Sequence, residues 1–226
     1  MRREEISRRQ FLKIIKELNG NYIYNDHGRM VKFDLTYLDE MKKYRQLLSA
    51  FSSINVEQIE WLSNVRVKNS HLPEGVVICD RTPVGVIYPH YFEGYKSLFH
   101  TNQEDSKLML DNMSTAVENN LELIDAGVVN TDFAAKNVLY SGKHVELIDL
   151  SGKHIKRGLY NDNYEPAYSY FIPDMYKIIG TKLIGLYGVE ETKRILKELK
   201  ESIPNGYYRE KPMEIIEGID KMRVLK

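Results

Sequence analysis

Two aspartates and an asparagine between residues 129 and 152 have the types and the spacing that could do chemistry together. The segment reads VNTDFAAKNVLYSGKHVELIDLSG and contains Asp132, Asn137 five residues later, and Asp149. One carboxylate can accept a proton from a hydroxyl group. A second carboxylate, together with an amide oxygen, can hold a divalent cation that neutralises phosphate charge. This set of side chains therefore predicts phosphoryl transfer from a metal-bound nucleotide.

The residues between Asn137 and Asp149 predict a β-hairpin that brings these two side chains close to each other. Val138 to Tyr140 and Val145 to Ile148 are β-rich runs, and Ser141-Gly142-Lys143 between them is typical of a turn. An ordinary hairpin with polar ends is the alternative interpretation.

A second aspartate and asparagine share the same spacing, at Asp125 and Asn130. They lie at the end of a helical pattern, whereas Asp132 and Asn137 lead directly into an apolar strand. The context therefore favours Asp132 and Asn137.

The segment resembles the catalytic and metal-binding loops of the protein-kinase-like superfamily, whose signature is H-R-D-L-x-x-x-N followed by D-F-G. The resemblance implies that Asp132 is the catalytic base or orients the acceptor, and that Asn137 and Asp149 are metal ligands. The implied cofactors are ATP and Mg²⁺ or Mn²⁺. Asn130-Thr131 replaces the His-Arg of the signature, and Leu150-Ser151-Gly152 follows the second aspartate.

Further residues have roles that the resemblance implies. Lys136 could neutralise the transferred phosphate, or it could be a solvated loop lysine. Lys32, in the run Met-Val-Lys-Phe, is similar to the strand lysine that contacts the nucleotide phosphates, and Glu40 is the first candidate to orient it. Glu57 and Glu60 are the rival candidates, and a solvated glutamate in the first helical turn is the alternative for Glu40.

The hinge of such a fold would lie near Pro89-His90-Tyr91. Its backbone would contact the adenine through His90 and Tyr91, because Pro89 has no N–H. Asp174 resembles the aspartate that braces the catalytic loop, and a plain first-turn acid is the alternative. A glycine-rich phosphate loop is absent, since Gly20 stands alone between the first helix and the first hairpin.

The pattern of elements predicts an α+β protein with a bilobal, protein-kinase-like arrangement. We expect residues 1–91 to form an N-terminal helix and a β-rich nucleotide-binding lobe, and residues 92–226 to form a helical catalytic lobe. The expected helices are 2–18, 36–51, 56–62, 105–126, 174–187, 190–202 and 212–222. The expected strands are 22–24, 30–33, 65–67, 75–80, 84–88, 138–140 and 145–148, and residues 153–170 are expected to form a loop.

Composition limits the classes of partner. Lys and Arg number 32, as do Asp and Glu, so the formal net charge is zero and neither a nucleic acid nor a membrane is implied as partner. The single cysteine, Cys79, lies in an apolar run and excludes an internal disulfide, so a cytoplasmic protein is expected. The protein is expected to be a monomer. Its expected partners are a nucleotide and a protein or small-molecule hydroxyl acceptor.

Two alternatives to an active kinase follow from the same residues. The lone Gly20, Asn130-Thr131 and Leu150-Ser151 are compatible with a kinase-shaped pseudoenzyme that serves as a nucleotide-binding or protein-interaction module. A weaker alternative is that a basic N-terminal helix binds a partner. Acidic residues within the same helix reduce its positive charge. Hydroxyl groups of proteins and of small molecules are both open as acceptors, and Ser151, Tyr160 and Ser169 are candidates for self-phosphorylation.

Overall fold

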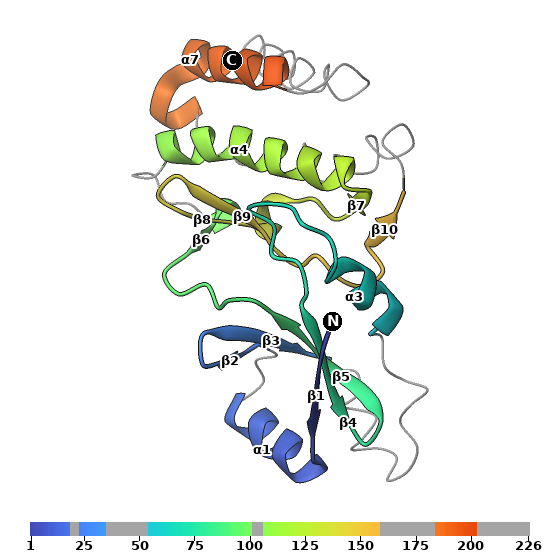
Figure 1. Ribbon diagram of the computed structural model, residues 1–226. Helices are drawn as coiled ribbons and strands as arrows, with labels where there is room; N and C mark the ends of the chain where they lie inside the picture. Colours follow the sequence, from blue (N-terminus) through green and yellow to red (C-terminus); the bar gives the residue numbers. More distant parts are fainter. Residues whose placement is uncertain (19–22, 35–53, 101–105, 159–183, 203–226) are drawn as a thin grey trace. The chain divides into compact units, whose positions relative to one another are not determined.

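The computed structural model describes residues 1–18, 23–34, 54–100, 106–158 and 184–202 (Figure 1). The chain forms two compact units, and its elements are those of a mixed α+β protein. Unit 1 comprises Met1–Arg66, His71–Glu93 and Leu150–Lys153, and unit 2 comprises Val67–Ser70, Gly94–Asp149 and His154–Lys226. Each unit thus includes a short segment enclosed in sequence by the other.

Unit 1 contains a five-stranded sheet with the strand order β1-β4-β5-β3-β2 (Figure 1). The strands are β1 (Arg2–Ile6), β2 (Ile23–Asp26), β3 (Arg29–Phe33), β4 (Gly75–Cys79) and β5 (Thr82–Tyr88). β1 pairs in parallel with β4, and the other neighbouring pairs are antiparallel. The hairpins β2–β3 and β4–β5 confirm the predicted strand pairs of this part of the chain.

The predicted helix from residue 2 to residue 18 is wrong in its first part. Residues 2–6 form β1, and the helix α1 spans Arg8–Leu18. The helix begins here because Ser7 and Gln10 form a capping box, in which Gln10 N donates to Ser7 Oγ at 3.3 Å and Ser7 N donates to Gln10 Oε1 at 2.8 Å. Residues 2–6, which precede the helix, are extended and pair with β4.

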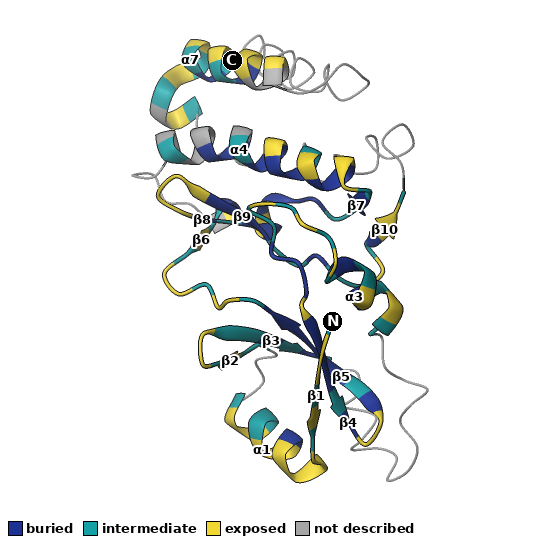
Figure 2. Cartoon of the chain, viewed as in Figure 1, coloured by how far each residue is buried: buried dark blue, intermediate teal, exposed yellow. Residues whose placement is uncertain are grey.

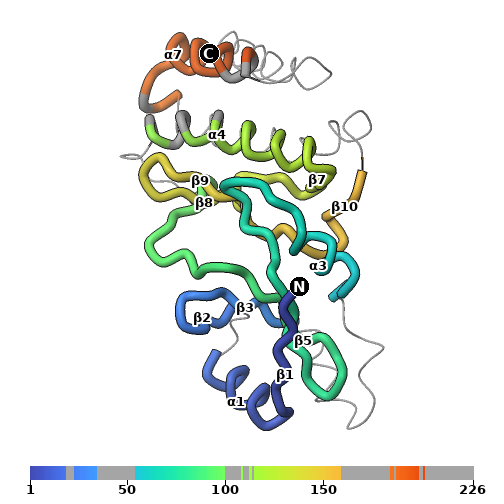
Figure 3. Tube along the Cα trace, in the orientation of Figure 1, coloured from blue at the N-terminus to red at the C-terminus, as the bar shows by residue number. Residues whose placement is uncertain are grey.

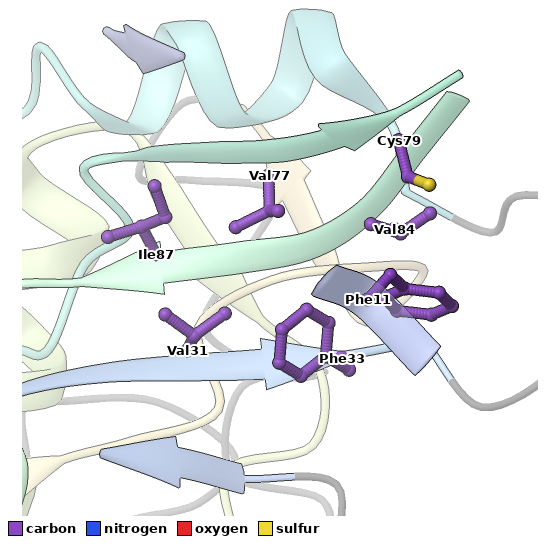
Figure 4. Packing of buried hydrophobic residues seen from close by; sticks show 7 residues of the cluster. All are labelled: Phe11, Val31, Phe33, Val77, Cys79, Val84 and Ile87. Carbon is purple, nitrogen blue, oxygen red and sulfur yellow. The ribbon is translucent and has the colours of Figure 1, made fainter. Parts of the chain in front are cut away.

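The two faces of the sheet in unit 1 pack against different helices. Figure 4 shows the face toward α1, where Phe11 lies beside Phe33 with a ring-centroid distance of 5.6 Å. This cluster consists of Phe11, Val31, Phe33, Val77, Cys79, Val84 and Ile87. On the other face, Ile59 of α3 (Val56–Leu62) packs with Val76, Val86 and Tyr88. Burial of Cys79 within the first cluster raises the pKa of its thiol.

Unit 2 is built around the long helix α4 (Ser106–Asp125), which contacts strands β7 and β9 and helix α7 (Figure 3). β6, β8 and β9 form a three-stranded sheet, and β7 pairs with β10. The bounds are β6 (Lys96–Ser97), η1 (Leu98–His100), β7 (Val128–Asn130), η3 (Ala135–Asn137), β8 (Val138–Ser141), β9 (His144–Leu147), β10 (Ile155–Arg157) and α7 (Ile184–Ser202). Figure 2 shows the β8–β9 region as largely buried.

Several other predictions can be compared with the structure. The predicted helix 56–62, the long helix after residue 105 and the β-hairpin formed by residues 138–148 are confirmed. A strand at residues 65–67 is wrong, because Val65 N closes a turn onto Leu62 O after α3. The predicted loop from residue 153 contains β10, and Gly188, at φ 73° and ψ 173°, interrupts α7 where two helices were predicted.

The predicted helices 36–51 and 212–222 lie outside the described residues, as does most of the predicted helix 174–187. None of the helices in the described ranges is long and apolar enough to cross a lipid bilayer.

Candidate functional site

Asp132 and Asn137 contact each other directly in unit 2. The side-chain Nδ2 of Asn137 donates to the backbone O of Asp132 at 2.8 Å and to its Oδ2 at 3.1 Å. These two bonds fix the orientation of the Asn137 amide, and the side chain is also buried, with 8% exposure. Because the nitrogen faces Asp132, the amide oxygen is the atom that remains to face a cation.

The turn before Asp132 is fixed by Asn130. The Oδ1 of Asn130 accepts a hydrogen bond from the backbone N of Asp132 at 2.9 Å, which is the geometry of an Asx turn. Asn130 is buried at the end of β7, whereas Asp125 is exposed at the end of α4. The second pair with the same spacing therefore consists of an exposed acid, Asp125, and a buried asparagine that caps the turn, Asn130.

Lys136 lies beside the carboxylate of Asp132. The distance from its Nζ to Asp132 Oδ2 is 3.3 Å, and the lysine side chain is 58% exposed. An exposed ion pair of this kind contributes about 0–1 kcal/mol to stability. The ion pair places a positive charge next to the predicted base, where an anionic group could also be neutralised.

The hairpin β8–β9 returns the chain from Asn137 to Asp149. Val138 is paired with Leu147, and Ile148 N donates to Asn137 O at 2.9 Å, so the backbones meet at the open end of the hairpin. Asp149 follows at once, with φ 62°. Aspartate is one of the non-glycine residues that adopt this left-handed conformation more readily.

The residues that follow Asp149 are held within unit 1. Leu150 is fully buried, and Tyr88 Oη donates to Ser151 Oγ at 2.8 Å. Gly152 exchanges two hydrogen bonds with the side chain of Gln58 on α3. Sequence reasoning missed both Gln58 and Tyr88, because neither belongs to a local pattern and both are far from residue 149 in sequence.

The structure describes the position of Lys32 and of two of the glutamates that could orient it. Lys32 is half-buried on β3, opposite Val86 of β5 in the register, and therefore on the sheet face that packs against α3. The helix on this face carries Glu57 and Glu60, which are both exposed. Glu40 and Asp174 lie outside the described residues.

The backbone donors of the predicted hinge are already engaged. Tyr91 N donates to Gly28 O at 2.8 Å, and His90 N faces His71 Nε2 at 3.5 Å. Tyr91 itself is 40% exposed. An adenine that used these N–H groups would have to displace the present acceptors.

His71 is a buried titratable group of unit 1. It is 1% exposed, and its ring stacks on Tyr88 at 4.8 Å. Burial, with a smaller contribution from the charge of His90, lowers the pKa of His71 to about 3. His71 is therefore neutral at physiological pH.

The residues around Asn137 can be compared with what a magnesium ion requires. Within the described ranges, no three His, Cys, Asp or Glu side chains converge as metal ligands. Mg²⁺ does not need such a cluster, because it is usually held by one or two carboxylates and completes its shell with phosphate oxygens and water. The carboxylate of Asp132 lies next to the amide of Asn137, and the backbone of Ile148, the residue before Asp149, meets that of Asn137.

Comparison with known proteins adds no assignment. No family model matches the chain, and no curated protein shows significant similarity to it.

Proposed function

We propose that this protein is a phosphotransferase with a bilobal, protein-kinase-like fold, which transfers the γ-phosphate of ATP to a hydroxyl group. The observation that carries the proposal is the bond network of Asp132, Lys136 and Asn137, together with the hairpin that leads from Asn137 to a left-handed Asp149. Proton acceptor, cation and amide are next to each other, as phosphoryl transfer requires.

Each residue has a distinct role in this proposal. Asp132 orients the acceptor hydroxyl and takes its proton at a carboxylate oxygen. Lys136 neutralises negative charge beside that oxygen, and Asn137 fixes the carboxylate through Nδ2. Asn137 Oδ1 and the Asp149 carboxylate would hold Mg²⁺ or Mn²⁺, which supplies charge neutralisation of the phosphates. The roles of Lys32, Glu40, His90 and Tyr91 stay predictions from the resemblance.

A labelled γ-phosphate assay tests the proposal, first with the protein alone and then with protein extracts and metabolite pools. Removing a general base typically lowers turnover about 10²–10⁴-fold, so Asp132→Ala should lose transfer yet retain nucleotide binding. Asp149→Ala should weaken the binding of magnesium–ATP itself. Asp125→Ala is the matched control, because this exposed aspartate belongs to the second pair with the same spacing. Full activity of the Asp149→Ala protein would refute the assignment.

The alternative is a kinase-shaped pseudoenzyme that binds nucleotide or a protein partner. The engaged N–H of Tyr91 favours it, since this donor is not available to adenine without rearrangement. Thermal unfolding separates the two functions. A ligand at 100 times its dissociation constant adds about 2.7 kcal/mol, which is about 5–10 °C for a chain of this size. A shift with magnesium–ATP but no transfer supports the pseudoenzyme, and no shift leaves a protein-interaction module.

A further inference from the structure

The side-chain hydroxyl of Ser97 joins two short 3₁₀ turns of unit 2, η1 and η3. Ser97 Oγ donates to Ala135 O at 3.2 Å and to Lys136 O at 3.3 Å, and it accepts from Phe99 N at 3.2 Å. The single hydroxyl proton is shared between two carbonyls, so both distances exceed that of an ordinary O–H···O bond. One hydroxyl group therefore caps the start of η1 and binds the carbonyls of η3.

The η3 turn needs a partner from outside because it is only three residues long. Such a turn leaves its last carbonyls without partners inside the turn. Val138 N binds Ala135 O, and the carbonyl of Lys136 is bound by Ser97, which lies 39 positions earlier in the sequence. Ser97 is half-buried at the end of β6, opposite Leu139 of β8 in the register. The position of η3 is thus tied to a distant segment of the same unit.

Both side chains that contact the carboxylate of Asp132 come from η3. Lys136 Nζ lies 3.3 Å from Asp132 Oδ2, and Asn137 Nδ2 lies 3.1 Å from the same oxygen. Because both contacts fall on one oxygen, they set the rotation of the carboxylate about its terminal bond, which otherwise has broad freedom. A shift of η3 would move both contacts together. The orientation of Asp132 is therefore linked to the hydrogen bond between Ser97 and Lys136.

We propose that Ser97 is a positioning residue for the Asp132 carboxylate, acting through the backbone of η3. The inference rests on the proposed function, in which Asp132 orients the acceptor hydroxyl and takes its proton. It adds a residue that no motif of the sequence marked, and all the residues that it involves belong to unit 2. A misplacement of about 1 Å at a reacting group can cost about 10²-fold in rate, so the placement of η3 bears directly on turnover.

The experiment compares the full chain carrying Ser97→Ala with the wild type and with two further variants. Ser97→Thr retains the hydroxyl group. Ser63→Ala is the matched control, because Ser63 is also half-buried and its Oγ donates to the backbone O of Glu60 at 2.8 Å. Ser63 belongs to unit 1, so this control tests whether the loss of any serine hydroxyl of this kind has the same effect.

The first measurement needs no nucleotide. The side-chain amide signal of Asn137 in ¹⁵N NMR reports its contact with Asp132 Oδ2, and the Asp132→Ala protein gives the position of this signal when the contact is lost. We expect the signal of Ser97→Ala to move toward that position. The signal should stay at its wild-type position in Ser63→Ala and close to it in Ser97→Thr.

The second measurement is steady-state phosphate transfer from γ-labelled ATP. In Ser97→Ala we expect kcat to fall about 10–100-fold with an unchanged KM for ATP, because the orientation of the base affects the chemical step and not nucleotide binding. Ser97→Thr should restore most of the rate, and Ser63→Ala should keep all of it. Residues that act through one another are not additive, so Ser97→Ala combined with Asp132→Ala should be no slower than Asp132→Ala alone.

Three results would overturn the inference while leaving the proposed function intact. They are an unmoved Asn137 signal in Ser97→Ala, a wild-type kcat in the same variant, and a further fall in rate when Ser97→Ala is added to Asp132→Ala. A Ser97→Thr protein as slow as Ser97→Ala would also overturn it, because the hydroxyl would then not be the group responsible.

Failure of the proposed function gives a different result. If the wild type transfers no phosphate, the proposed function fails, and the positioning role of Ser97 fails with it. If Ser97→Ala does not fold, Ser97→Cys decides by the same two measurements, because a thiol has a similar shape and is only a weak donor.

Discussion

The amide of Asn137 shows why the residue type matters at this position. Its nitrogen lies 3.1 Å from Asp132 Oδ2, a distance at which a second carboxylate oxygen would be repelled. An amide donates there and still offers an oxygen on its other side. One side chain can therefore hold the predicted base and present a ligand for a cation, which neither aspartate nor leucine could do.

His71 leads to a prediction about stability and pH. The ordinary pKa is 6.5, and burial lowers it to about 3 in the folded protein. Between these values the unfolded chain binds a proton that the folded chain does not bind. The free energy of unfolding should therefore fall as the pH falls from 6.5 to 3, with a contribution from His71 of at most about 1.4 kcal/mol per pH unit.

His71→Phe should make this dependence shallower, since phenylalanine keeps the stack on Tyr88 and does not titrate. Urea unfolding between pH 6 and pH 4 measures it, with Trp61 on α3 as the fluorescent reporter. The control is His27→Asn, which removes an exposed histidine and tolerates its φ of 52°. Equal pH dependence in the wild type and His71→Phe would contradict the expectation.

The secondary structure around the candidate residues was predictable where the signal was local. The hairpin from Val138 to Leu147 followed from two β-rich runs and Gly142, whose φ is 59° in a two-residue loop. Contacts between distant residues left no such trace. The bond between Gln58 and Gly152 and the stack of His71 on Tyr88 depend on tertiary packing, which periodicity and turn chemistry do not encode.

At the scale of elements, β1 shows how tertiary pairing can override a local pattern. Residues 2–6 read RREEI, a charged run with weak strand propensity, and they form the edge strand of the sheet. Charged side chains are well suited to an edge, because they discourage pairing with another chain. The one local clue was the Ser7–Gln10 capping box, which marks where the helix begins.

Pairing of β1 with β4 depends on Gly75. A Cβ atom at this position would lie 2.8 Å from the carbonyl carbon of Arg2 and would overlap its oxygen. We therefore expect Gly75→Ala to displace β1 and to reduce the free energy of unfolding by about 1–3 kcal/mol, as overpacking does elsewhere. Chemical denaturation with Trp61 fluorescence provides the measurement.

The control for this substitution is Gly185→Ala in α7, where a Cβ would meet nothing within 4 Å. Alanine is favoured over glycine in helices by up to about 1 kcal/mol, so this variant should be neutral or more stable. A Gly75→Ala protein as stable as the wild type would show that β1 can pair without the close approach.

At the scale of the whole molecule, the sequence suggested two contiguous lobes that meet at residues 91 and 92. The two units instead exchange segments, since Val67–Ser70 belong to unit 2 and Leu150–Lys153 belong to unit 1. Composition and periodicity report on residues that are neighbours in the sequence. They carry no information on which distant segments pack together, so they cannot reveal such an exchange. The first stretch of unit 2 is tied to the rest of that unit by Leu147 N, which donates to Asn69 O at 3.1 Å.

The exchange of segments predicts where a core substitution should act. Leu150 is fully buried and belongs to unit 1, although unit 2 surrounds it in sequence. Replacing a buried leucine by alanine costs about 2–5 kcal/mol. Leu150→Ala should therefore reduce the hydrogen-exchange protection of amides in β4 and β5, which are strands of unit 1.

Leu196→Ala is the matched substitution in unit 2, because Leu196 is 1% exposed on α7. We expect it to reduce protection in α4, which contacts α7, more than in β4 and β5. Residue-resolved hydrogen exchange of the two variants shows whether a substitution destabilises the unit that contains the residue or the residues next to it in the sequence. If Leu150→Ala lowered protection in α4 while leaving β4 and β5 unchanged, residues 150–153 would belong with their sequence neighbours. The anchoring of the chain after Asp149 would then have to be sought in unit 2.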